Sequence, residues 1–109
     1  MSQAQFIHDG AAVDFTPDED VAAGTIVVVG DLVGVTKRDI ASGVLGAIAV
    51  EGVFDVIKDS AVSISAGAKV YWDAVNSLTV TTATGNKLIG KAIADAGVGK
   101  TEVRVRLSQ

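Results

Sequence analysis

The sequence predicts an all-β domain with at most one short helix. The strand-favouring residues Val, Ile and Thr number 18, 8 and 8 among the 109 residues, whereas Leu and Met, which favour helices, number 5 and 1. Twelve glycines separate short apolar runs at intervals typical of turns in a small β domain. In residues 102–107 apolar side chains alternate strictly with charged ones, as in a strand with one buried face.

The first expected element is a β-hairpin. Residues 6–8 and 12–15 flank Asp9-Gly10, a dipeptide that tolerates the positive φ angles of a type I′ turn. Residues 16–19, Thr-Pro-Asp-Glu, then have the pattern of a helix N-terminus. Because Gly24 follows so soon, we expect a helix of only one or two turns.

Eight further strands are expected along the rest of the chain. Each is a short run rich in β-branched or apolar residues and is bounded by turn-forming residues. The run from residue 42 to 56 is nearly all apolar and does not alternate, so we expect strands that are buried on both faces or lie at an oligomer interface. The expected strands are 25–29, 32–36, 44–50, 53–57, 68–73, 78–82, 88–94 and 102–107.

An internal repeat underlies this order. Residues 23–27, AGTIV, return as residues 66–70, AGAKV, and residues 46–49, GAIA, have a counterpart in residues 90–94, GKAIA. Two copies are too few for a solenoid, which needs at least three repeats. The repeat therefore favours a small barrel with pseudo-two-fold symmetry.

The repeat predicts one domain over residues 1–109, with repeated halves at 23–57 and 66–107. Four glycines stand at matching points of the halves, where a Cβ would hinder the backbone. A tryptophan follows the second Ala-Gly turn, and we expect it to face the core, with use as a ligand platform as the alternative. The residues expected at turns and in the core are Gly24, Gly67, Gly46, Gly90 and Trp72.

Composition excludes several classes of function. The net charge of −4 and the scattered Lys and Arg residues argue against a nucleic-acid-binding protein. No run of apolar residues is long enough to span a membrane, and the N-terminus lacks the pattern of a signal peptide. Without Cys, the chain has no disulfide, thiol nucleophile or Cys-based zinc site. We expect no enzyme activity, cofactor or metal.

Two motifs have sequence patterns similar to those of known binding sites. Residues 94–101, ADAGVGKT, differ from a phosphate-binding P-loop by Ala94, and the expected strand 102–107 leaves no room for the helix that a P-loop requires. We interpret this motif as a Gly-rich turn. The four acids between residues 14 and 20 lack the spacing of a calcium loop and are expected to be a solvated cluster. His8, beside Asp9, is expected to be an exposed hairpin residue because neighbouring strand residues face opposite sides.

Several strings of the sequence resemble one known family. AGTIVVVGDLVGVTKRDIASGVLGAIAVEGVFDV is followed by AGAKVYWD, GNKLIGKAIADAG and VRVRL. Together they resemble the small capsid cement, or head decoration, proteins of tailed phages, some of which carry the label RecA/RadA-like recombinase. The resemblance covers about residues 4–107. Ile57 departs from the family, which often has Pro before the following Lys.

The resemblance implies a structural virion protein that binds the major capsid protein on the outside of the head and is assembled in the host cytoplasm. It also implies a β-clip-like barrel and a homotrimer, and it implies no catalysis. Residues 1–8 have no strong fold signal except as an edge strand, so they could reach a partner as an extended arm. The residues expected to contact the capsid are Gln3, Gln5 and Phe6.

Two alternatives belong to other classes of protein. One is a small ligand-binding or accessory β-barrel that uses Trp72 and nearby acids. The other is a nucleotide-dependent recombination protein, which the missing P-loop geometry disfavours. Under the leading hypothesis the partners are the capsid protein and further copies of this chain, with no nucleic acid, membrane or small-molecule substrate.

Overall fold

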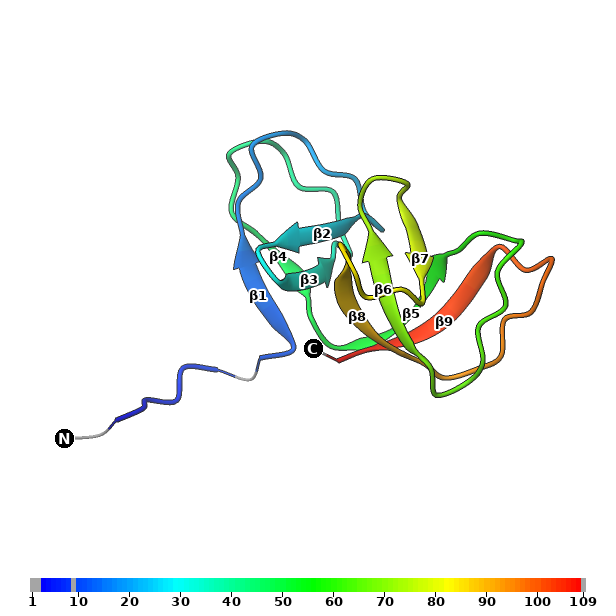
Figure 1. The fold of residues 1–109 in the computed structure, drawn as a ribbon. Helices are drawn as coiled ribbons and strands as arrows, with labels where there is room; N and C mark the ends of the chain where they lie inside the picture. Colours follow the sequence, from blue (N-terminus) through cyan, green and yellow to red (C-terminus); the bar gives the residue numbers. More distant parts are fainter. Residues whose placement is uncertain (1–2, 9, 109) are drawn as a thin grey trace.

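The computed structural model describes residues 3–8 and 10–108, which form nine strands and no helix (Figure 1). No helix that could span a membrane is found in these residues. All strand pairings are antiparallel. The strands are β1 (Ala12–Phe15), β2 (Ile26–Val29), β3 (Leu32–Val35), β4 (Gly46–Ala49), β5 (Gly52–Ile57), β6 (Lys69–Asp73), β7 (Leu78–Val80), β8 (Lys87–Ala92) and β9 (Glu102–Leu107).

The strands form two sheets. One is four-stranded with the order β1-β4-β3-β2, and the other is five-stranded with the order β5-β9-β8-β6-β7. In the second sheet Lys58, the residue after β5, forms one isolated bridge with Thr79 of β7. Both sheets remain open in their strand order, so the described residues form no closed barrel. The predicted all-β class is correct, whereas the expectation of a closed barrel is not met.

The local strand predictions agree well with the structure. Each of the eight expected strands coincides with an observed strand to within two residues at either end, and the last strand has the predicted bounds. Along β9 exposed and buried residues alternate strictly. The pattern of apolar and charged residues therefore decides both the place of this strand and the face that it buries.

The predicted N-terminal hairpin is wrong. Residues 6–8 belong to no strand, and β1 pairs with β4 instead, in a register that places Ala12 opposite Ala49. Asp9, at the predicted turn, lies outside the described residues. A two-stranded hairpin is marginal in water, whereas pairing with β4 adds β1 to a larger sheet and half-buries Val13 and Phe15.

The predicted short helix is also wrong. The carbonyl oxygens that would accept hydrogen bonds within a helix are bound by a distant loop. The Pro17 oxygen accepts from the Gly43 amide at 2.8 Å, and the Asp18 oxygen accepts from the Ser42 hydroxyl at 2.7 Å. The Asp20 carboxylate accepts from the Ser42 amide at 2.8 Å. These bonds hold residues 17–20 in an irregular segment against the chain that leads into β4.

The apolar run 42–56 does not form a pair of strands buried on both faces. It contains β4 and most of β5, and these strands lie in different sheets. Val44, Leu45 and Val53 are exposed. Exposed apolar residues are compatible with the other expectation for this run, a place at an oligomer interface, which stays a prediction.

One hydrophobic core cluster contains residues of both sheets. Val33 of β3, Val70 of β6, Ile89 of β8 and Val105 of β9 each have 0% relative exposure and belong to one buried cluster. Full burial of an apolar side chain of this size contributes about 1.5–3 kcal/mol. The sheets therefore stabilise one another.

Turns of the same geometry precede β2 and β6. Gly24 and Gly67 have φ angles of +80° and +87°, a region that a Cβ disfavours. The Gly24 amide donates to the Thr36 oxygen at 2.6 Å, and the Gly67 amide donates to the Ala92 oxygen at 2.7 Å. The first turn thus joins the segment before β2 to the residue after β3. The second turn joins the segment before β6 to the end of β8.

The side-chain bonds at these turns also recur. The Ala23 amide donates to the Asp39 carboxylate at 2.8 Å, and the Ala66 amide donates to the Asp95 carboxylate at 2.8 Å. The strand order agrees as well, because β1-β4-β3-β2 and β5-β9-β8-β6 place the corresponding strands in the same order. Strand β7 is left without a counterpart in the first sheet.

The strand order changes one detail of the repeat. Gly90 lies within β8, whose counterpart in the first sheet is β3, and the glycine of β3 is Gly34. Gly46 instead begins β4, the counterpart of β9. The sequence comparison that matched Gly46 with Gly90 therefore aligned strands that occupy different places in the two sheets.

Candidate functional site

The titratable residues do not gather into a site. Among residues 3–8 and 10–108 no group of three or more His, Asp or Glu side chains is placed to hold a metal ion. The four acids of the 14–20 segment are exposed, and so is His8. The acidic cluster is Asp14, Asp18, Glu19 and Asp20.

The P-loop-like segment 94–101 has the geometry of a turn. A P-loop directs its backbone amides at phosphates, but here several of these amides are bound within the protein. The Ala96 amide donates to the Ile64 oxygen at 2.8 Å, and the Gly99 amide donates to the Ser60 oxygen at 2.7 Å. Strand β9 follows where a helix would be needed.

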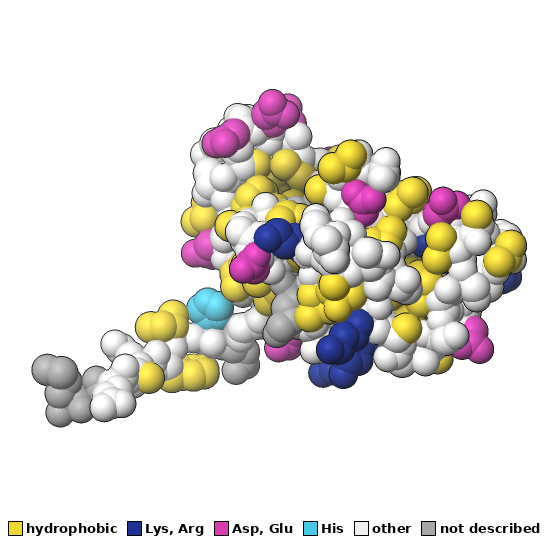
Figure 2. All heavy atoms as spheres, viewed as in Figure 1, with side chains coloured by type: hydrophobic (Ala, Val, Ile, Leu, Met, Phe, Trp, Pro, Cys, Tyr) yellow, Lys and Arg dark blue, Asp and Glu magenta, His cyan; other side chains and the backbone are white. Residues whose placement is uncertain are grey.

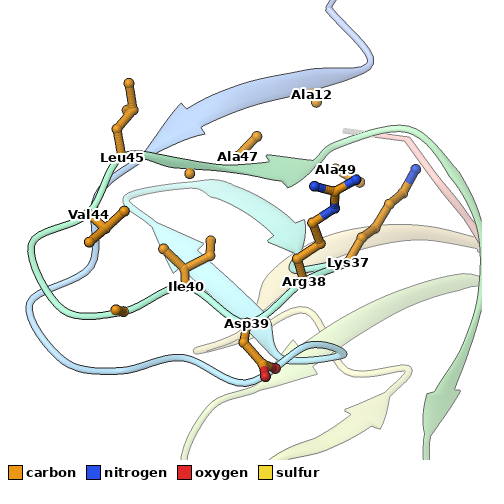
Figure 3. A pocket seen from close by; sticks show the side chains of 11 residues that line it. Ala12, Lys37, Arg38, Asp39, Ile40, Val44, Leu45, Ala47 and Ala49 are labelled. Atoms are coloured by element: carbon orange, nitrogen blue, oxygen red, sulfur yellow. The ribbon is translucent and has the colours of Figure 1, made fainter.

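A surface pocket of about 490 Å³ lies beside β4 (Figure 3). We call it the β4 pocket. Ile40, Val44 and Leu45 form an apolar end, and Lys37 and Arg38 project at the other end, near Ala49. Its lining residues are Ala12, Lys37, Arg38, Asp39, Ile40, Ala41, Val44, Leu45, Gly46, Ala47 and Ala49.

Local packing explains the apolar end of the β4 pocket. A Cβ on Gly46 would lie 2.6 Å from the Cδ1 atom of Ile40, so glycine at this position lets Ile40 pack directly against β4. Ile40 is held in place by a pair of backbone hydrogen bonds with Val21, both 2.8 Å long. Leu45, just before β4, remains 67% exposed.

The basic end of the β4 pocket carries two cationic side chains. Lys37 and Arg38 are exposed, and neither forms an ion pair with a described residue. Within residues 3–8 and 10–108 the ion pairs are Lys87 with Asp31, at 2.6 Å, and Arg104 with Asp55, at 3.0 Å. The two basic side chains at the pocket are thus available to an acidic partner.

Hydrogen bonds lower the pKa of three aspartates elsewhere on the surface. The Lys87 ammonium lowers the pKa of the Asp31 carboxyl, and the Arg104 guanidinium lowers that of Asp55. The pKa of Asp73 is lowered by hydrogen bonds from the Asn76 side chain and backbone and, to a smaller extent, from the Val75 amide. Since these groups are dispersed, they indicate local salt bridges and turns and not a catalytic centre.

The predicted contact residues Gln3, Gln5 and Phe6 lie on an arm that extends away from the body of the protein (Figure 1). Residues 3–8 form no strand. Phe6 and Ile7 are 80% and 75% exposed, and Figure 2 shows hydrophobic side chains along the arm. Their contact with a capsid stays a prediction.

The remaining predicted residues lie in the interior or at its edge. Trp72 is half-buried and packs against the core cluster, as do Phe54 and Ile26. Gly90 is buried where β8 and β9 approach closely, and a Cβ there would lie 2.0 Å from the Arg106 backbone oxygen. Sequence reasoning missed the β4 pocket as a site, and its only signal was the non-alternating apolar run 42–56.

Comparison with known proteins gives one match. A family model described as phage cement protein matches residues 7–107, a range that includes both sheets and the β4 pocket. No curated protein and no solved structure matches the chain. Proteins of this family are structural, non-catalytic components of the phage capsid, so the resemblance and the prediction that the chain is not an enzyme are confirmed. The chain belongs to the phage cement protein family.

Proposed function

We propose that the protein binds the outside of the major capsid lattice of a tailed phage or prophage and stabilises the particle. It binds as a homotrimer, and the particle is assembled in the host cytoplasm. The match to the phage cement family over residues 7–107 is the observation on which the proposal depends. The recurring Ala-Gly turns before β2 and β6 support a relation to β-clip domains, although the sheets are open.

The β4 pocket is the proposed lattice contact. Its apolar end exposes Val44 and Leu45, whose burial against a partner would be favourable. Its basic end carries Lys37 and Arg38 on a chain whose net charge is −4, so it favours a segment with an acidic residue. We expect the partner to be an extended stretch of the capsid protein with apolar residues next to an acid.

Trimer formation would strengthen this contact. A cement protein binds a lattice whose sites repeat by symmetry, and linked copies engage several sites at once. The effective concentration of the second and third copies rises once the first is bound. A modest affinity for each site is therefore sufficient for a stable coat.

Co-sedimentation with purified, expanded capsids of the parent phage tests the proposal. Leu45→Asp places a charge at the apolar end and should weaken binding by about tenfold or more. Val75→Asp is the matched control, because Val75 is 93% exposed in the turn between β6 and β7 and outside the pocket. It should bind like the wild type.

Failure of the wild-type protein to sediment with capsids, together with its absence from purified virions by mass spectrometry, would contradict a cement role. If Leu45→Asp and Val75→Asp bind equally well, the protein contacts the lattice by another surface. Circular dichroism of both variants checks that each is folded.

A further inference from the structure

The two halves of the repeat differ at one strand edge, which is covered in the second sheet and uncovered in the first. In the five-stranded sheet β7 pairs with the outer edge of β6. The counterpart of β6 in the first sheet is β2, and among the described residues β2 pairs only with β3. The first sheet thus lacks the strand that completes the second. An uncovered edge presents unpaired backbone amides and carbonyls to any extended chain of suitable shape.

The positions on this edge can be identified from the repeat. Gly24 and Gly67 are 43 residues apart, and the same spacing relates Val28 and Val29 to Tyr71 and Trp72. In the second sheet these two positions pair with β7, with Trp72 opposite Thr79. In the first sheet Val28 and Val29 are 36% and 49% exposed.

Nothing in β2 protects this edge from pairing. Natural edge strands are often blocked by Lys, Pro or a β-bulge. Strand β2 has the sequence IVVV and contains neither Lys nor Pro, and its pairing with β3 is regular. The strand therefore has the composition of an edge that is covered in the assembled protein.

The arm supplies an extended segment that has no strand partner. Residues 3–7, QAQFI, carry no charge, and in them Gln3 and Gln5 alternate with Ala4 and Phe6. The arm continues into β1, which is the edge of the first sheet opposite to β2. Figure 1 shows it pointing away from its own body, so an acceptor on a second copy fits its direction.

We propose that residues 3–7 of one copy add as a strand to the β2 edge of a second copy. The added strand completes the four-stranded sheet as β7 completes the five-stranded one. Main-chain hydrogen bonds provide affinity, and burial of Phe6 beside the exposed valines of β2 adds to it. The capsid contact is then made by the β4 pocket and not by the arm.

In the proposed arrangement copies associate head to tail. Donor and acceptor lie on opposite edges of one sheet, so the contact is heterologous and closes when the rotation between copies allows. Three copies in such a ring give the homotrimer of the proposed function. Only the number of copies rests on the proposed function. The pairing itself needs no capsid.

Disulfide trapping tests the pairing, because the chain has no cysteine of its own. Val28→Cys is combined in turn with Ala4→Cys, Gln5→Cys and Phe6→Cys, which samples the register of the added strand. Under mild oxidation at least one combination should form links between copies, seen as dimers and trimers on a non-reducing denaturing gel. The same arm variants combined with Val75→Cys are the controls and should remain monomeric.

The experiment is done with the free protein and with the protein bound to expanded capsids. Links in either setting support the pairing, and mixing two single-Cys variants shows that the link is between chains. Deletion of residues 1–8 should weaken self-association by about tenfold or more, measured by light scattering across concentrations. A link within one chain, a link from the arm only to capsid protein, or no link in either setting would overturn the proposal without affecting the test of the β4 pocket.

Discussion

Replacement of Gly90 by alanine should destabilise the protein strongly. A Cβ at this position would lie 2.0 Å from the Arg106 oxygen and 2.8 Å from the Ser108 nitrogen. Both atoms belong to the backbone, so no side-chain rotation can relieve the contact. Carbon and oxygen atoms of neighbouring strands normally stay about 3.3–3.6 Å apart. The added methyl group therefore forces β9 away from β8 by more than about 1 Å.

The magnitude follows from what that movement breaks. Leu107 lies opposite Gly90, and the Ser108 amide donates to the Ile89 oxygen at 3.0 Å. Overpacking of a buried site costs about 1–3 kcal/mol when side chains can adjust. Because backbone must move here, we expect about 3 kcal/mol or more, which lowers the Tm of a domain of this size by roughly 12 °C.

Thermal unfolding by circular dichroism and urea unfolding by Trp72 fluorescence measure the effect. Gly97→Ala is the matched control, since a Cβ there has no atom within 4 Å and the φ angle is not positive. It should change stability by no more than about 0.5 kcal/mol. If Gly90→Ala melts within about 2 °C of the wild type, β8 and β9 do not approach as closely as this reasoning requires.

Three further predictions concern the core and the surface charges. Thr79→Val should stabilise the protein by about 1–2 kcal/mol in urea unfolding, because the Thr79 hydroxyl is buried and has no hydrogen-bond partner among the described residues. Thr36→Val is the contrasting variant and should destabilise the protein, since the Thr36 hydroxyl accepts from the Thr25 amide and donates to the Ala22 oxygen. Equal effects of the two substitutions would refute this reasoning. Ile89→Ala should cost about 2–5 kcal/mol in the same assay, and a smaller loss would argue against its full burial. Arg104 lowers the pKa of Asp55 in the folded state, so the contribution of this pair to stability is present above the unfolded pKa of about 3.9 and is lost as pH falls through the lower folded value. Asp55→Asn should therefore make the free energy of unfolding less sensitive to acid. An unchanged pH profile of stability would contradict the assignment.

Local patterns predicted most of the strands because they need only neighbouring residues. The strict alternation in residues 102–107 decided both the bounds of β9 and its buried face. The same local reasoning failed at the N-terminus. The Asp9-Gly10 signal favoured a hairpin, but β1 pairs with β4, whose residues lie more than thirty positions further along the chain. The Pro17 signal for a helix was overcome by hydrogen bonds from the distant loop at Gly43.

The site was less predictable than the fold. The sequence resemblance already pointed to the phage cement family, and the arm was recognisable by its weak fold signal. The β4 pocket was not, because its wall joins Ala12 to residues between 37 and 49 only after β1 has paired with β4. Lys58, which is buried and donates to the Asp59 oxygen at 2.8 Å, likewise gave no signal in the sequence.

By itself, the sequence determined the all-β class, the places of the strands, the family and the absence of cysteine chemistry. These properties depend on composition, on local alternation and on motifs that are contiguous in the chain. Only the tertiary structure decided which strands pair, that Gly34 and not Gly46 matches Gly90, and that the β2 edge is left uncovered where β7 covers β6. The physical reason is that a strand's backbone groups can bond to many possible partners. The choice among them is made by long-range burial, which no local window of sequence contains.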